Sequence, residues 1–208
     1  MAIARNIETK IHGRFLFEDR GHERLIVGFH GYAETAEAHL AELQKIAGID
    51  RWSVAAVQAL HPFYTRSGSV VANWMTSLDR EIAVADNLAY VGNVLASLPT
   101  PTTLVFSGFS QGAAMAYRAA AAFPQAAAVI VLGGDLPPDV TANLPPILIG
   151  RGVRDEWFTA EKFDKDLKSL AGRAQVTTCV FDGGHEWSDE YRRAASEFLA
   201  RCPTVSTA

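Results

Sequence analysis

Residues 108–112, Gly-Phe-Ser-Gln-Gly, place a serine between two glycines at a spacing typical of an activated nucleophile. An apolar run from Thr103 to Phe106 precedes them, and an alanine-rich stretch from Gln111 to Phe123 follows them. In such a strand–turn–helix, side chains at the glycine positions would collide with neighbouring backbone, and the first helical amides face any developing negative charge. Ser110 is therefore the candidate nucleophile.

A nucleophilic serine needs a base and an acid, and in the strand–turn–helix arrangement these follow it in the order acid, then histidine. Asp155 lies in the loop after the apolar run from Ile147 to Ile149. His185 follows the run from Val176 to Phe181 and two glycines that allow a tight loop. The sequence therefore predicts a Ser110–His185–Asp155 catalytic triad.

Other acids and histidines fit this order less well. Asp135 is a rival acid because it follows the strand-like run from Ala127 to Leu132, and Asp139 and Glu156 are weaker rivals. Among the remaining histidines, His12 and His22 come too early, His39 is expected on a solvated helix face, and His61 is a candidate for lining the site.

An oxyanion hole is expected from two backbone amides. One is the N–H of Gln111, which follows the serine, and the other is the N–H of Tyr32 in the sequence Phe-His-Gly-Tyr at the end of an early strand. We expect His30 to support this loop through hydrogen bonds, although an ordinary histidine at a strand end would fit the sequence nearly as well.

Buried strands and amphipathic helices alternate along the chain, which predicts an α/β fold with a mainly parallel central sheet and helices on both faces. The expected strands are 25–29, 54–57, 103–106, 127–132, 147–149 and 176–181, and the expected helices are 36–47, 79–98, 111–123, 160–170 and 189–199, the last capped by Ser188.

Two segments are harder to place. The alternation from Ile7 to Phe17 predicts a hairpin or edge strand, and the stretch from His61 to Ser77 shows no periodicity. A long irregular loop of this kind is often functional, and it is a candidate lid. With 208 residues and no linker or repeat, residues 1–208 are expected to form a single domain.

Composition excludes several classes of protein. The chain is 49% hydrophobic and 20% charged with a net charge of −4 and no basic stripe, so no nucleic-acid partner is expected. Cys179 and Cys202 form no zinc or redox motif, and we expect no metal and no cofactor. Neither a signal peptide nor a membrane span is indicated, so the expected location is cytoplasmic. The oligomeric state stays open.

Together these motifs resemble the phospholipase/carboxylesterase family of α/β-hydrolases, which contains bacterial carboxylesterases and acyl-protein thioesterases. The resemblance runs from Leu25 to Leu199 and rests on His30-Gly31, the Gly-Phe-Ser-Gln-Gly sequence, Asp155 after its strand, and Gly184-His185. It implies an α/β-hydrolase fold without a large cap domain or a cofactor. The family often has a Gly-Asp pair soon after its His-Gly motif, where this sequence reads Tyr-Ala-Glu-Thr at 32–35. It also departs from the family's Asp-x-Val-Pro at 155–158, and these differences leave the substrate class open.

The expected activity is a carboxylesterase-type serine hydrolase that cleaves small-molecule esters or thioesters through an acyl-enzyme on Ser110. Two alternatives remain, namely a non-catalytic binding protein on a hydrolase fold and an acyltransferase or perhydrolase using the same triad. Candidates for an apolar acyl or aryl pocket are the loop aromatics, chiefly Phe63, Trp74, Trp157 and Trp187, with Tyr64 and Phe158 nearby.

Overall fold

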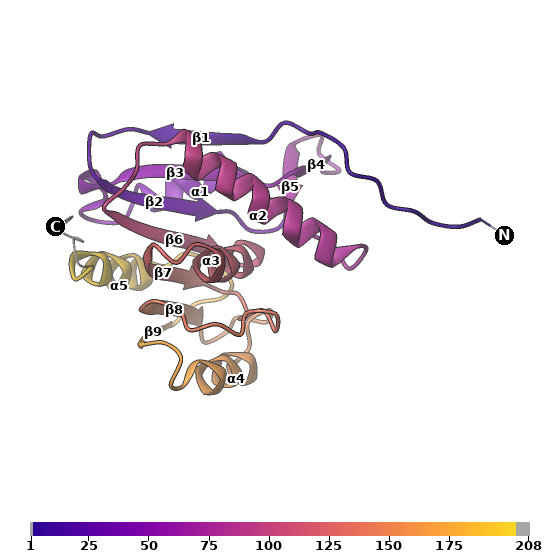
Figure 1. Ribbon diagram of the computed structural model, residues 1–208. Helices are drawn as coiled ribbons and strands as arrows, with labels where there is room; N and C mark the ends of the chain where they lie inside the picture. The colour runs from indigo at the N-terminus through magenta and orange to yellow at the C-terminus, as the bar shows by residue number, and fades with distance from the viewer. Residues whose placement is uncertain (1, 203–208) are drawn as a thin grey trace.

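The computed structural model describes residues 2–202, and its centre is a seven-stranded sheet (Figure 1). Its strands lie in the order β1-β3-β2-β6-β7-β8-β9, and every pairing is parallel except that of β1 with β3. The strands are β1 (Arg14–Glu18), β2 (Arg24–Phe29), β3 (Ser53–Gln58), β6 (Thr103–Phe109), β7 (Ala126–Leu132), β8 (Ile147–Gly152) and β9 (Val176–Phe181).

Helices cover both faces of this sheet. The core on one face includes residues of α2 (Arg80–Ser97), α3 (Gln111–Ala122) and α4 (Ala160–Leu170). The core on the other face includes residues of α1 (Ala36–Leu43) and α5 (Asp189–Ala200). Side chains of β2 alternate between the two cores, which is why its sequence is continuously apolar. The predicted α/β architecture is confirmed.

The positions of the predicted elements also agree closely with the structure. The helix expected over 36–47 ends at Leu43, and a short 3₁₀ turn, η1 (Ile49–Arg51), leads into β3. Ser188 caps α5 as predicted, because its hydroxyl accepts the amide of Tyr191 at 3.1 Å.

The prediction for the first segment is wrong over Ile7 to Gly13. The strand β1 begins only at Arg14 and pairs with residues 54–58 of β3, whose last residue is Gln58. No part of β3 therefore remains to pair with the preceding residues. Ile7 is 90% exposed, and in Figure 1 the segment before β1 runs away from the sheet as an extended arm.

The stretch from His61 to Ser77 is more regular than its sequence indicated. It forms an antiparallel hairpin of β4 (His61–Tyr64) and β5 (Val70–Asn73), with Gly68 in the turn at a φ of +85°. An isolated bridge between Glu34 and Ala72 joins this hairpin to the loop after β2. The hairpin thus supports a loop at the carboxyl edge of the sheet, where the parallel strands all end.

Candidate functional site

Ser110 occupies the sharp turn between β6 and α3. Its φ of 52° and ψ of −119° are strained for a residue with a side chain. A side chain at Gly108 would collide with the backbone of Gly112, and one at Gly112 would collide with the backbone of Phe29. The two glycines are therefore required by close packing of the turn, as the sequence indicated.

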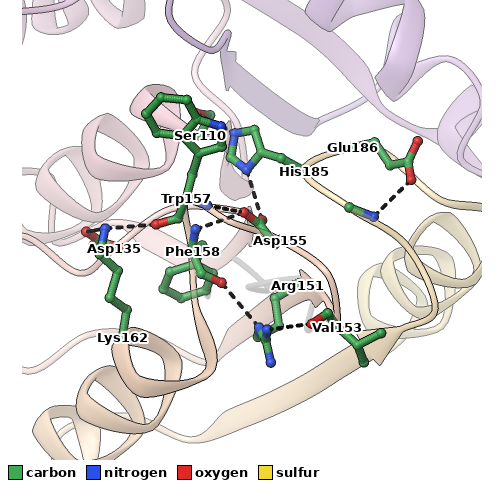
Figure 2. Close-up of polar contacts among 11 residues, drawn as sticks. Ser110, Asp135, Arg151, Val153, Asp155, Trp157, Phe158, Lys162, His185 and Glu186 are labelled. Atoms are coloured by element: carbon green, nitrogen blue, oxygen red, sulfur yellow. Dashed lines mark hydrogen bonds and ion pairs between the residues drawn. The ribbon is translucent and has the colours of Figure 1, made fainter.

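His185 connects Ser110 to Asp155 through both ring nitrogens. Its Nδ1 lies 2.9 Å from Asp155 Oδ2, and its Nε2 lies 2.8 Å from Ser110 Oγ. Figure 2 shows the imidazole beside these two side chains, which come from the ends of different strands. Nδ1 can donate to the carboxylate, which leaves Nε2 free to accept the serine proton.

Asp155 is 5% exposed and is fixed by its own loop. Its Oδ1 accepts the backbone amides of Trp157 at 2.9 Å and Phe158 at 2.8 Å, while Oδ2 faces His185 (Figure 2). Buried carboxylates are stabilised by such hydrogen bonds.

The rival acids lie elsewhere. Asp135 forms an ion pair with Lys162 at 3.1 Å, and Asp139 accepts two hydrogen bonds of 2.7 Å from Arg118. The side chain of Glu156 is exposed and has no contact with His185 among residues 2–202. Of the candidate acids, the structure brings only Asp155 to the imidazole.

His30 supports the loop after β2, as predicted. Its Nε2 accepts the amide of Ala59 at 3.0 Å, so the ring proton resides on Nδ1 and is donated to Gly31 O at 2.7 Å. Burial of the ring lowers the pKa of His30 and keeps it neutral.

Tyr32 lies in a turn that is held at several points. Within residues 2–202 its amide has no hydrogen-bond acceptor, and Gln111, as the first residue of α3, also has a free amide. Ala33 adopts a left-handed φ of 58°, and its amide donates to Ala72 O at 3.0 Å. This turn therefore holds the Tyr32 amide in one place beside the strand ends.

Glu34 is a site residue that the sequence did not reveal. Its Oε2 accepts the amide of Gly31 at 2.7 Å, which closes the turn around Tyr32. Burial raises the pKa of the Glu34 carboxyl, and the nearby His185 lowers it by a smaller amount. An acidic residue three positions after Gly31 was the only signal available in the sequence.

Trp74 does not line a pocket, which corrects the expectation from the sequence. Its side chain is completely buried, so it offers no surface to a substrate. Its Nε1 donates to His30 O at 2.8 Å, and its backbone amide donates to Gln111 Oε1 at 2.8 Å. Trp74 thus connects the two segments that carry the free amides.

The other three aromatics predicted for the pocket lie around the site. Phe63 packs against the Tyr32 ring with centroids 5.6 Å apart. Trp187 packs on Phe109 at 6.1 Å, and Phe109 in turn lies 5.0 Å from the His185 ring. Trp157 is 73% exposed and lines the same cavity as Ser110.

A cavity of about 570 Å³ opens beside Ser110. Trp157 contributes to its wall, but much of the remaining lining is polar or charged and comes from the loop after β7 and from α4. Apolar side chains, including Leu136, Val140 and Trp157, share this lining with six charged ones, so an apolar pocket for an acyl or aryl group stays a prediction. The charged lining residues are Arg80, Asp135, Lys162, Lys165, Asp166 and Arg173.

Within residues 2–202, no group of three or more histidine, cysteine, aspartate or glutamate side chains could hold a metal ion. Within the same residues, every helix is too short or too polar to cross a membrane.

No model of a known protein family matches the sequence, and no curated protein matches it. The structure is nevertheless similar to solved structures. Acyl-protein thioesterase 2 from Zea mays has a TM-score of 0.73 and 19% identity over 91% of this chain and 98% of its own. A carboxylesterase from Mesorhizobium loti has a TM-score of 0.77 and 16% identity over 94% and 98%. The Bacillus cereus carboxylesterase has a TM-score of 0.75 and 15% identity over 92% and 95%. The chain therefore has the α/β-hydrolase fold of these proteins.

Proposed function

We propose that the protein is a serine hydrolase that cleaves carboxylic esters or thioesters through an acyl-enzyme on Ser110. The observation that carries this proposal is the position of His185, whose ring nitrogens lie within hydrogen-bond distance of Asp155 Oδ2 and of Ser110 Oγ. Ser110 itself occupies a strained turn. The similarity in fold to carboxylesterases and a thioesterase supports the proposal.

In the first half of the reaction, Ser110 Oγ attacks the substrate carbonyl carbon while His185 Nε2 takes the hydroxyl proton. The imidazolium is stabilised by Asp155, which keeps its charge. The tetrahedral oxyanion accepts hydrogen bonds from the amides of Tyr32 and Gln111, each typically worth ~3 kcal/mol in the transition state. The bond to the alcohol or thiol then breaks, and His185 gives its proton to that leaving group.

In the second half, a water molecule attacks the acyl-enzyme. His185 Nε2 takes a proton from the water, and the oxyanion forms again in the same place. Collapse releases the carboxylic acid, and the proton returns from His185 to Ser110 Oγ.

The test is hydrolysis of p-nitrophenyl esters from acetate to palmitate, with labelling by a fluorophosphonate probe that reacts only with an activated serine. We expect turnover and labelling in the wild type, and a loss of at least about 10³-fold in kcat for the Ser110→Ala variant.

The exposed serine Ser69, in the hairpin turn, provides a matched control, and Ser69→Ala should leave both readouts unchanged. A folded wild-type protein that neither turns over the esters nor reacts with the probe would favour a binding protein instead. Release of ester or peroxide products in the presence of alcohols or peroxide would favour acyl transfer.

A further inference from the structure

The cavity beside Ser110 has a local excess of positive charge. Four cationic side chains line it, against two carboxyl groups, although the whole chain has a net charge of −4. A concave site lined by one sign of charge concentrates ligands of the opposite sign. The cationic residues are Arg80, Lys162, Lys165 and Arg173.

Two of these cations already have partners. Lys162 Nζ lies 3.1 Å from Asp135 and donates to Trp157 O at 2.8 Å (Figure 2). The Arg173 guanidinium donates to backbone carbonyls, including Val140 O at 2.8 Å. These two side chains build the walls of the cavity and are not free to bind a ligand.

The other two cations, Lys165 and Arg80, are exposed at the cavity. Within residues 2–202, neither terminal group forms a hydrogen bond or an ion pair with another side chain. Arg80 lies within electrostatic range of Asp139, but that carboxylate is already bound by both arms of Arg118. Lys165 and Arg80 thus remain available to a ligand.

The carboxyl groups in the wall offset these charges only in part. Asp135 is paired with Lys162. Asp166 is 4% exposed, its Oδ2 accepts the amide of Leu136 at 2.7 Å, and burial raises its pKa to about 6, while Lys165 and Lys162 lower it by smaller amounts. Even with both acids ionised, four cations face two carboxylates, so the cavity keeps an excess of positive charge.

This charged wall begins directly at Ser110. The Ser110 amide donates to Leu132 O at 2.8 Å, and a side chain at Gly134 would collide with the Ser110 backbone. The loop that continues to Asp135 therefore runs from the serine into the cavity, and Figure 2 shows Asp135, Lys162 and Trp157 on that side of Ser110.

We propose that this cavity binds an anionic ester, one whose acyl or alcohol part carries a carboxylate, and that Lys165 and Arg80 bind that carboxylate. The proposal rests on the function proposed above for Ser110. The exposed Trp157 ring covers the hydrocarbon part of the substrate between the ester and the charge.

The test uses two pairs of substrates in which a carboxylate is replaced by a neutral amide of the same shape. One pair, p-nitrophenyl hydrogen adipate and p-nitrophenyl adipamate, places the charge in the acyl part. The other, 4-acetoxybenzoate and 4-acetoxybenzamide, places it in the leaving group. In at least one pair, we expect kcat/KM to be about fivefold higher for the anion at low salt, and the preference to decline with added salt.

The variants Lys165→Gln and Arg80→Gln should each reduce that preference by at least about twofold while leaving kcat/KM for the neutral amides unchanged. The matched control is Lys168→Gln, an exposed lysine of the same helix that does not line this cavity. The absence of a preference in both pairs, or a preference that persists in both variants, would overturn the proposal. Failure to hydrolyse any of the four substrates would instead contradict the proposed esterase activity, and this inference with it.

Discussion

The side-chain amide of Gln111 forms two hydrogen bonds with the backbone around Trp74. Its Oε1 accepts the Trp74 amide at 2.8 Å, and its Nε2 donates to Met75 O at 2.8 Å. The residue that offers its own amide to the proposed oxyanion is thereby fixed to the segment between the hairpin and α2. Preorganised donors act because they need no reorientation during the reaction.

Replacing Gln111 with Met keeps the length of the side chain and removes both hydrogen bonds. The Trp74 amide and Met75 carbonyl would then lack their partner, at a typical cost of 1–3 kcal/mol each. We expect kcat for p-nitrophenyl acetate to fall about tenfold with little change in KM, and the free energy of unfolding to fall by about 2 kcal/mol. The variant Gln111→Glu keeps the acceptor for the Trp74 amide, so its kcat and its free energy of unfolding should lie between those of the wild type and the Met variant. An unaltered kcat in the Met variant would contradict this role.

Glu34 should matter for turnover through its hydrogen bond with Gly31. A hydrogen bond to a charged group is typically worth 1.5–3 kcal/mol, so Glu34→Ala should lower kcat about tenfold while KM changes less. Glu34→Gln keeps an acceptor oxygen and should recover most of the activity. The control is Glu37→Gln, a change at an exposed carboxylate paired with Arg14, which should leave kcat unchanged. Equal activity of the Ala variant and the wild type would refute a positioning role for Glu34.

His39 should make the protein less stable as the pH falls. Burial lowers its pKa to about 3, whereas an unfolded chain has an ordinary value of 6.5. Between these values the unfolded chain binds a proton that the folded chain does not, so stability is lost below about pH 6.5. In urea unfolding at pH 7.5, 6 and 5, we expect the contribution of His39 to lower the free energy of unfolding by about 1 kcal/mol per pH unit as the pH falls.

The His39→Gln variant should show a shallower pH dependence than the wild type. His30, whose pKa is also lowered by burial, contributes in the same direction and remains in the variant. Parallel curves for the variant and the wild type would mean that the pKa of His39 is the same in the folded and the unfolded chain, which would contradict the prediction.

Asp166 has the opposite effect on stability. Its pKa is raised from 3.8 to about 6, so between these values the folded chain binds a proton that the unfolded chain does not. Its contribution is therefore most favourable below about pH 4 and is lost as the pH rises through 6. Asp166→Asn keeps an acceptor for the Leu136 amide and should be about 1 kcal/mol more stable than the wild type at pH 7.5. Urea unfolding should show this difference shrinking toward pH 4; a variant less stable at every pH would contradict it.

The mainly parallel sheet agrees with a prediction that needed only local signals, and its strand ends bring Ser110, Asp155 and His185 together. Buried parallel strands are continuously apolar, and their carboxyl ends meet at one edge, so residues just after them come together. Ser110, Asp155 and His185 all occupy such positions.

Predictions failed where long-range packing decides the environment of a residue. Trp74 was expected at a pocket because its neighbours in sequence are irregular, but the hairpin and α3 enclose it. His39 is expected from the sequence on a solvated helix face, yet its ring is buried and lies against Trp187, with ring centroids 5.7 Å apart. The charged cavity is likewise lined by the loop after β7 and by α4. No local sequence pattern indicates that these two segments lie together.

In the loop after β8, the backbone and the side chain of Trp157 have different roles. Asp155 is held by the backbone amide of Trp157, whereas the exposed indole of Trp157 faces the cavity. The amide is present whichever side chain stands at position 157, proline excepted. The side chain at position 157 can therefore change, and with it the surface that faces the cavity, without loss of the hydrogen bond from its amide to the acid.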